Sequence, residues 1–286
     1  MNIVSWNIQA GLGLDGEVDL SRIANVLRAL PFHTGNGPDV ICLQEVSRHF
    51  SALTNGTPDD QPAQLEALFP EYTCIFRPAV DLGPYGNDTA GKTRQFGCMI
   101  LSRFPVSQVF NRLLTQQGAG GKRMQRHVLE AIVEAPSGPV RVATTHLEFN
   151  SHPCRLAQVD QILSDYQETL NTPTPSSLLH TDSPYSAAPR PTAAIVCGDF
   201  NFLTDSPEYQ RLTATNSGFQ DAWCLLDGKQ RSFFTCGFDN AVQWPEGPHC
   251  RDFFFITNEL ADNVTQIGVD TETRASDHQP IYLTVA

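Results

Sequence analysis

Short apolar runs, each bounded by polar or turn residues, recur along the whole chain and limit the fold more than any other feature. Runs of this length and composition are typical of β-strands. We predict strands at Met1–Ile8, Asp39–Leu43, Thr73–Phe76, Cys98–Ser102, Val128–Val133, Val140–Leu147, Ala194–Cys197, Phe253–Ile256 and Ile281–Val285. Because these strands are many and short, we expect sheets with several antiparallel pairings.

Helical patterns lie between some of the predicted strands. Leu20–Leu30 has apolar residues at helical spacing, and Arg155–Leu170 is amphipathic. Ser206–Ala214 opens with a serine that can cap a helix and a proline suited to its first turn. Ala79–Gln95 and Thr115–Arg126 are rich in glycine and polar residues, which indicates loops.

The segment 171–192 is rich in Pro, Ser and Thr, which predicts a flexible surface insertion. A substrate lid and an interdomain linker are the alternatives. Since the apolar segments on both sides are expected to join one sheet system, we predict a single domain over residues 1–286.

Composition and charge exclude several classes of protein. No apolar run reaches the roughly 18 residues of a membrane span, and the N-terminus lacks a signal-peptide pattern, so we expect a cytoplasmic location and no membrane span. The net charge of −12 argues against tight, extended binding of nucleic acid, although a bound metal ion can supply local positive charge. The 8 cysteines lack CxxC spacing, which predicts buried free thiols rather than disulfides or a zinc site.

Polar residues that could take part in catalysis or metal binding stand at the ends of three predicted strands. Asn7 can hold a water or a phosphate oxygen, or simply start a turn. Glu45 ends a strongly apolar run, where an unpaired carboxylate is costly, so it is a candidate ligand for Mg²⁺. His146 is suited, as an imidazolium, to a phosphoryl oxygen, but a structural role is the commoner use of such a histidine.

Further carboxylates, an amide and a second histidine follow later in the chain. In Gly198-Asp199-Phe200-Asn201 the two polar residues alternate, so both can face one side as a hydrolytic pair. Asp252 begins an apolar strand, and Asp277 and His278 stand next to each other before the last strand. This order suggests that Asp252 orients the His278 ring.

Together these residues resemble the endonuclease/exonuclease/phosphatase superfamily, which has the DNase I-like fold. The resemblance covers essentially the whole chain, because seven short motifs occur in family order: Trp6-Asn7, Leu43-Gln44-Glu45, Gly97–Pro105, Thr145-His146-Leu147, Gly198–Asn201, Arg251-Asp252 and Ser276-Asp277-His278. It implies an α/β fold, a four-layer sandwich of two mostly antiparallel β-sheets packed face to face with helices on the outside.

The resemblance also implies a role for each matching residue. Glu45 becomes the principal ligand of Mg²⁺ or Mn²⁺, with Asn7 and Asp277 in the coordination shell or reaching it through water. Asp199 orients or deprotonates the attacking water, and Asn201 holds the phosphate or the water.

The two histidines complete the implied site. His146 and His278 contact the scissile phosphate, and Asp252 fixes the tautomer of His278. Arg123, Arg126 and Asn150 are weaker candidates for contact with a substrate phosphate; a solvated basic turn is the alternative for the two arginines.

We therefore predict a metal-dependent hydrolase of phosphoester bonds, a phosphodiesterase or endonuclease-like enzyme that uses a Mg²⁺-assisted, Asp-activated water. Its expected partner is a phosphoester substrate, either nucleic acid or a smaller nucleotide-like or lipid-like diester, and no protein partner is evident. The alternatives are a phosphatase of a small phosphorylated metabolite or inositol phosphate, and a catalytically inactive binding member of the fold.

Overall fold

The computed structural model describes residues 1–55, 59–85, 91–118, 121, 123–172, 190–227, 233–238 and 244–286. The insertion predicted at 171–192 falls mostly on residues 173–189, which lie outside the described residues. The single domain over residues 1–286 stays a prediction.

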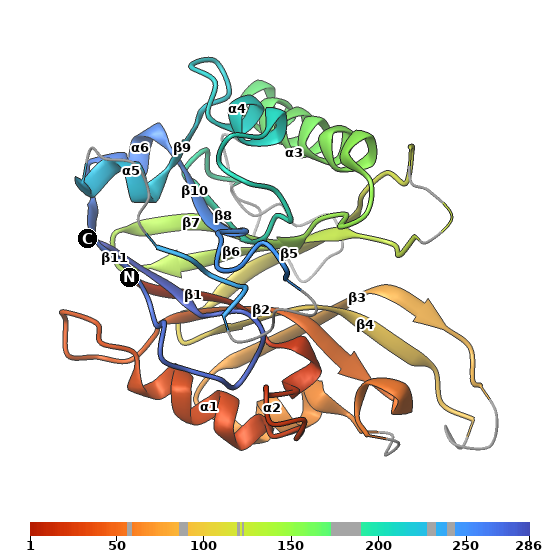
Figure 1. Ribbon diagram of the computed structural model, residues 1–286. Coiled ribbons are helices and arrows are strands. Elements are labelled where there is room, and N and C mark those ends of the chain that lie inside the picture. Colours follow the sequence, from red (N-terminus) through yellow and green to blue (C-terminus); the bar gives the residue numbers. More distant parts are fainter. Residues whose placement is uncertain are drawn as a thin grey trace, which may run out of the picture.

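Two six-stranded sheets form the centre of the structure (Figure 1). The first has the order β11-β12-β1-β2-β4-β3, made of Val264–Val269, Ile281–Val285, Asn2–Asn7, Val40–Arg48, Arg94–Ser102 and Thr73–Leu82. The second has the order β5-β6-β7-β8-β10-β9, made of Val106–Leu113, His127–Ala135, Gly138–His146, Ala194–Asp199, Asp252–Thr257 and Phe219–Asp221. In the described strands β1 pairs with β2 and β7 with β8 in parallel, whereas the other neighbours are antiparallel.

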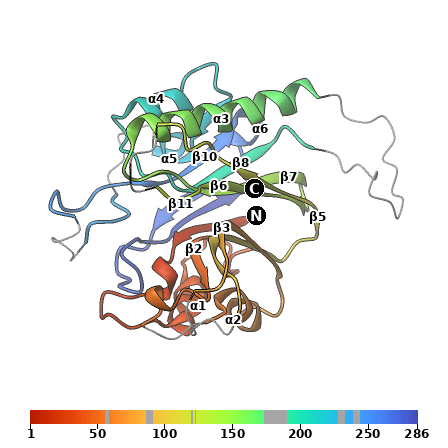
Figure 2. The same ribbon diagram turned by 90° about the vertical axis from the view of Figure 1, so that its right-hand side faces the viewer.

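Helices cover the outer faces of both sheets (Figures 1 and 2). Helices α1 and α2 lie below the first sheet, and α3 and α4 lie above the second; α5 and α6 contact β9 at the edge of the second sheet. Their bounds are Leu20–Ala29, Gln61–Leu68, His152–Asn171, Pro207–Leu212, Ala222–Asp227 and Asn258–Ala261, and two short 3₁₀ helices, η1 and η2, span Gln9–Gly11 and Ser51–Leu53. The four-layer α/β sandwich expected from the sequence is confirmed. Among the described helices, none combines the length and apolar character of a membrane span.

The alternation of side chains along each strand builds the layers. Ile3, Val40 and Cys42 point between the two sheets, whereas Val4 and Ile41 pack on the side of α1. Successive strand residues face opposite ways, so two faces of one apolar strand fill two different cores. The 8 cysteines are all free, and most are buried, as the sequence predicted.

Several elements were not foreseen from the sequence. Strand β5 lies at the edge of its sheet and is only partly buried, so it lacks a continuous apolar run. Helix α2 has almost no segregation of apolar residues to one face. The loop expected at Ala79–Gln95 is wrong at its two ends, because β3 continues to Leu82 and β4 begins at Arg94.

A buried histidine links the two sheets next to their shared core. His127 on β6 is 2% exposed; its Nε2 accepts a hydrogen bond of 3.1 Å from the Cys98 amide on β4. Its Nδ1 lies 2.6 Å from Oδ1 of Asn111 on β5, which makes Nδ1 the protonated nitrogen. Burial lowers the pKa of His127 to about 4, because the charged ring is poorly solvated there.

His127 is expected to weaken the fold in mild acid. Its folded-state pKa is lower than its unfolded value of about 6.5, so the unfolded chain takes up the proton first as the pH falls from 6.5 toward 4. Between about pH 7.5 and about pH 4.5 this difference lowers the free energy of unfolding by about 2–3 kcal/mol. Urea denaturation at the two pH values measures the loss, which should be smaller by about that amount in His127→Gln.

The exposed His33 provides a matched control for this measurement. His33→Gln should lose as much stability between the two pH values as the unchanged protein. An equal loss in His127→Gln would show that His127 does not cause the acid sensitivity.

Candidate active site

Polar side chains from both sheets meet where a set of strands end. Strand β1 ends at Asn7, β7 at His146 and β8 at Asp199, while β10 begins at Asp252. In the second sheet, Asp199 is the register partner of His146 on one side and of Asp252 on the other. The parallel pairing of β7 with β8 and the antiparallel pairing of β8 with β10 therefore place three predicted site residues side by side.

A β-bulge brings Glu45 to the same place. The register of β2 against β4 shifts between Leu43 and Val46, so Gln44 and Glu45 together face the single residue Cys98. Glu45 has a positive φ of 59°, which is uncommon for a residue with a side chain. The bulge adds one residue to the strand and lets Glu45 face the site although Gln44 already points between the sheets.

Gly198 permits the close approach of β8 to β7 just before Asp199. Its φ is +140°, and a Cβ atom there would lie 2.0 Å from the carbonyl oxygen of Thr145. Only glycine fits this position without moving the backbone. Gly198 therefore fixes the position of the following carboxylate.

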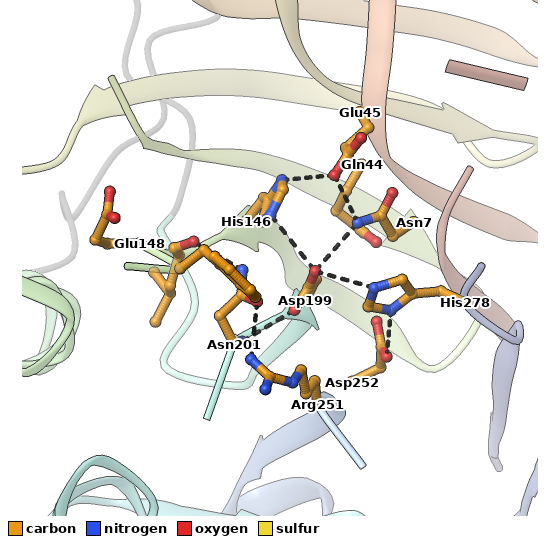
Figure 3. Close-up of polar contacts among 12 residues, drawn as sticks. Asn7, Gln44, Glu45, His146, Glu148, Asp199, Asn201, Arg251, Asp252 and His278 are labelled. Atoms are coloured by element: carbon orange, nitrogen blue, oxygen red, sulfur yellow. Dashed lines mark hydrogen bonds and ion pairs between the residues drawn. The ribbon is translucent and has the colours of Figure 1, made fainter. Parts of the chain in front are cut away.

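Asp199 lies at the centre of the polar cluster (Figure 3). Its Oδ2 accepts a hydrogen bond of 3.1 Å from the Asn7 amide, and its Oδ1 accepts one of 2.9 Å from the backbone amide of Asn201. Two ring nitrogens approach the same Oδ2: Nε2 of His146 at 3.4 Å and Nε2 of His278 at 3.6 Å. Burial, with a contribution from Asp252, raises the pKa of this carboxyl group.

His278 is held between two carboxylates. Its Nδ1 donates to Oδ2 of Asp252 at 2.9 Å, and Thr235 donates to the same oxygen at 2.6 Å. Burial alone lowers the pKa of His278, but the carboxylates of Asp252 and Asp199 outweigh it and raise the pKa well above its usual value. The ring is therefore an imidazolium at neutral pH, and Asp252 lies where the sequence placed it, behind the His278 ring.

His146 has the opposite protonation preference. It lies between Asp199 and Glu45, with Nδ1 3.7 Å from Oε1 of Glu45. Burial, together with the nearby charges of Arg126 and His278, lowers its pKa well below the usual value. The imidazolium considered from the sequence is thus disfavoured, and a neutral ring is the form that fits this position.

The acidic residues around Glu45 fit a divalent cation. Burial and the neighbouring Asp277 raise the pKa of Glu45 to about 7. The negative charges of Glu45 and Asp277 are therefore not fully balanced by the protein itself, and a bound cation would balance them. Oε1 of Glu45 accepts a hydrogen bond from the Asn7 amide at 3.0 Å, and Asp277 lines the same cavity. Carboxylate and amide oxygens are ligands that Mg²⁺ prefers. Glu45 and Asp277 would therefore hold the metal. The Asn7 nitrogen faces Glu45 while its oxygen accepts from the Gln9 backbone amide at 3.1 Å, so Asn7 would reach the metal through Glu45 or a water.

A second group of potential ligands, Asp199, Asp252 and His278, has its ligand atoms within 4.8 Å of one another. In the metal-free protein Nδ1 of His278 donates to Asp252, so this ring would have to give up a proton or use Nε2 to hold an ion. The carboxylates of Glu45 and Asp277 need no such change, and this difference favours a metal beside Glu45.

The cluster forms the floor of a cavity of about 630 Å³. Asn7 and Asp252 support it from behind, while the other candidates line it: Glu45, Arg123, Arg126, His146, Asn150, Asp199, Asn201, Asp277 and His278. Arg126 is buried, 3.9 Å from Glu148, and two of its nitrogens have no hydrogen-bond partner among the described residues. Arg123 and Asn150 are exposed, at the edge of the cavity. Of the three weaker candidates, Arg126 thus lies buried in the cavity, whereas Arg123 and Asn150 lie at its edge.

Some supporting residues escaped sequence reasoning. Ser276 donates to the carbonyl of Asn7 at 2.7 Å and accepts from the His278 amide at 3.2 Å, which ties the last loop to β1. Trp6 donates to the His278 carbonyl at 2.8 Å. These contacts join residues far apart in sequence, so they become visible only in the folded structure. The one sequence signal for Trp6 and Ser276 was that both belong to the motifs around Asn7 and His278.

An aromatic wall next to the floor was also missed. The Arg251 guanidinium lies 4.7 Å from the centre of the Trp244 ring and 5.3 Å from that of Phe149. Phe149 and Trp244 both line the cavity. At the start of α3, Arg155 donates to the carbonyls of Glu148 and Phe149, so it anchors the loop that follows His146.

Comparison with known proteins agrees with this architecture. The sequence profile described as "Endonuclease/Exonuclease/phosphatase family" matches residues 4–278. No curated protein matches the chain in sequence. An endonuclease/exonuclease/phosphatase from Beutenbergia cavernae is similar in structure, with a TM-score of 0.68 and 23% identity over 99% of this chain and 70% of that one.

Two further solved structures share the fold. The mannosyl-6-phosphatase Bt3783 of Bacteroides thetaiotaomicron has a TM-score of 0.68 and 16% identity, over 100% of this chain and 99% of that one. The 3′ phosphatase NExo of Neisseria, bound to a product DNA hairpin, has a TM-score of 0.61 and 18% identity over 100% and 99% of the two chains. Identities this low show the fold alone.

The pairing of His278 with Asp252 has a measurable consequence in the metal-free protein. In Asp252→Asn the ring loses its nearest carboxylate while it stays buried, so the titration of His278 should move to lower pH. Two-dimensional ¹H–¹⁵N spectra of the imidazole groups, recorded with EDTA present, follow this titration. Asp160→Asn, on the exposed side of α3, is the control and should leave it in place. An unchanged titration in Asp252→Asn would contradict the charge pairing.

Proposed function

Because this chain belongs to the endonuclease/exonuclease/phosphatase family and is a metal-dependent phosphoester hydrolase, we propose that it cleaves phosphodiesters with a water activated by Asp199. The observation that supports the proposal most is the position of Asp199: a buried carboxylate with raised pKa, flanked by two imidazoles on the floor of an open cavity. The metal we propose is Mg²⁺, with Mn²⁺ as a substitute. The cytoplasmic location expected from the sequence stays a prediction.

Asp199 suits the role of general base. Its raised pKa brings the carboxylate closer to the range in which a base accepts a proton efficiently near neutral pH. The Asn7 amide and the Asn201 backbone amide hold both of its oxygens in place, so the carboxylate does not need to reorient when it meets a water. Asn201 itself donates to the Leu147 carbonyl at 3.0 Å, which fixes the turn after β8.

The cations around the floor suit the charge of a phosphate. A bound metal ion would neutralise charge on the phosphate oxygens and acidify the water it holds. The His278 imidazolium, fixed by Asp252, can donate from Nε2 to a substrate oxygen, and the neutral His146 can donate one more hydrogen bond. The buried Arg126, which lacks sufficient partners of its own among the described residues, can pair with a third oxygen.

The shape of the cavity favours a diester over a monoester. A recess of about 350 Å³ continues from it past Phe149 and Asn201 toward Pro207. On the other side, a groove of about 580 Å³ shares Phe96, Arg123 and Met124 with the cavity. A phosphate seated between two such spaces has room for a substituent on each side, whereas a monoester would use only one.

A panel of substrates tests the reaction class. The purified protein is incubated with bis-p-nitrophenyl phosphate, p-nitrophenyl phosphate, supercoiled plasmid and an inositol phosphate, each with Mg²⁺, Mn²⁺ or EDTA. We expect EDTA-sensitive cleavage of the bis-aryl diester at a rate well above that of the monoester. Phosphate release from the monoesters alone would replace the diesterase by a phosphatase, and no turnover of any substrate would favour an inactive binding protein.

Glu45 should be necessary for the response to metal. Glu45→Gln keeps the size of the side chain but removes the ligand charge, and we expect turnover to fall on the order of 100-fold or more. Independently of activity, Mg²⁺ or Mn²⁺ should raise the thermal midpoint of the unchanged protein and not that of Glu45→Gln.

The exposed Glu17 provides the matched control, since Glu17→Gln removes the same charge from a residue that does not line the cavity. Glu17→Gln should keep both the turnover and the thermal shift. Full activity and a full thermal shift in Glu45→Gln would place the metal elsewhere.

A further inference from the structure

We propose that the groove beside the catalytic cavity binds an apolar substituent of the substrate, so that the enzyme prefers amphiphilic phosphodiesters with an alkyl or similar hydrocarbon group on one side of the phosphate. The inference rests on the proposed phosphodiesterase function and narrows its substrate class. Three observations lead to it: the apolar lining of the groove, its contact with the cavity, and the position of the charged residues beside it.

The first observation is a concentration of apolar side chains on an open surface. The groove lies between the residues around η2, the end of β3 and the segment before β6, and its apolar lining includes Phe50, Leu53, Val80, Leu82, Phe96 and Met124. Leu53 is 39% exposed and Leu82 is 45% exposed, although both are large hydrophobic residues. A large apolar side chain at the surface is common, but several gathered around one groove of about 580 Å³ indicate a binding site.

Strand geometry creates this lining. The register of β3 against β4 shifts between Pro78 and Val80, so Ala79 is the extra residue of a bulge. After the bulge Val80 stands opposite Phe96, and Leu82 follows on the same face of the strand. The ends of β3 and β4 extend to the right of the molecule in Figure 1, where they form one wall of the groove.

The second observation is contact with the catalytic cavity. Phe96, Arg123 and Met124 line both spaces. The two spaces therefore adjoin along these three residues, and a substituent attached to a phosphate in the cavity can reach the groove over the rim that they form.

The third observation is the distribution of charge. Arg123 stands at the junction, where it can stay near the phosphate. Asp81 stands between Val80 and Leu82 on β3, so its side chain lies on the opposite face of the strand, where it accepts a hydrogen bond from Gln95 at 3.1 Å. An anionic substituent, such as the next phosphate of a polynucleotide, would therefore meet a mainly apolar wall. An uncharged hydrocarbon chain meets neither a charge conflict nor an unsatisfied polar group. This comparison favours the apolar substituent over a nucleic-acid strand in the groove.

Mixed diesters with one p-nitrophenyl group and one methyl, butyl or octyl group measure the preference. Concentrations stay below those at which the octyl ester forms micelles. We expect kcat/KM to rise about 2–4-fold for each methylene that the groove covers, because burial of a methylene group is worth about 0.8 kcal/mol. The rise should appear mainly as a lower KM. Equal kcat/KM for the three esters would overturn the proposal.

The double variant Leu53→Asn/Leu82→Asn identifies the groove as the cause. Both positions are exposed, and neither belongs to the catalytic residues, so the methyl ester should be hydrolysed at the unchanged rate. The advantage of the octyl ester should fall by about 10-fold or more. Leu170→Asn, which changes an equally exposed leucine on α3, is the control and should keep the full advantage. An undiminished octyl preference in the double variant would overturn the assignment.

A binding measurement separates this proposal from the proposed reaction. If none of the esters is hydrolysed, the phosphodiesterase function is wrong, and the groove is tested by calorimetry with octyl phosphate and inorganic phosphate. The groove predicts that octyl phosphate binds at least about 10-fold more tightly, and that the double variant loses this difference. Equal affinity for the two ligands would overturn the proposal whatever the reaction.

Discussion

The buried carboxylate of Asp199 is the interaction on which the rest of the site depends. A carboxylate out of water is costly unless it is paired and hydrogen-bonded. Here the Asn7 amide comes from the first sheet, and the imidazolium of His278 comes from the loop before the last strand. The fold must hold each partner in place. The same contacts therefore stabilise the buried charge of Asp199 and fix the positions of the site residues.

The topology meets this requirement by ending strands of two sheets at the same level. The parallel pair β7/β8 places the two strand ends His146 and Asp199 side by side, and the parallel pair β1/β2 places the end of β1, Asn7, beside Gln44 and next to Glu45. Two local departures from regular strands then aim the side chains: the bulge at Glu45 and the close contact at Gly198. The regular strands form a rigid frame, and these two irregularities turn the side chains of Glu45 and Asp199 toward the cavity.

The sequence predicted the layers, and it pointed to most of the residues that gather around Asp199, because both leave local signals. Apolar runs identify buried strands, and a carboxylate or imidazole at the end of such a run, as at Glu45 and Asp199, is conspicuous. Strand β5 was missed because an edge strand need not be apolar on both faces. The protonation state of His146 and the contact of Ser276 with Asn7 depend on partners distant in sequence, so they were accessible only after folding.

The overall charge of the protein agrees with the proposed apolar groove beside the catalytic cavity. At a net charge of −12 the protein repels polyanions, and its few cations near the floor act over about a Debye length of 8 Å at physiological salt. Arg126 and His278 therefore favour a phosphate that has already entered the cavity, and they do little for the remainder of the substrate. A force that does not depend on charge can supply affinity for that remainder. Burial of hydrocarbon in the groove formed by β3, β4 and the segment before β6 supplies such a force, because it scales with the apolar area removed from water.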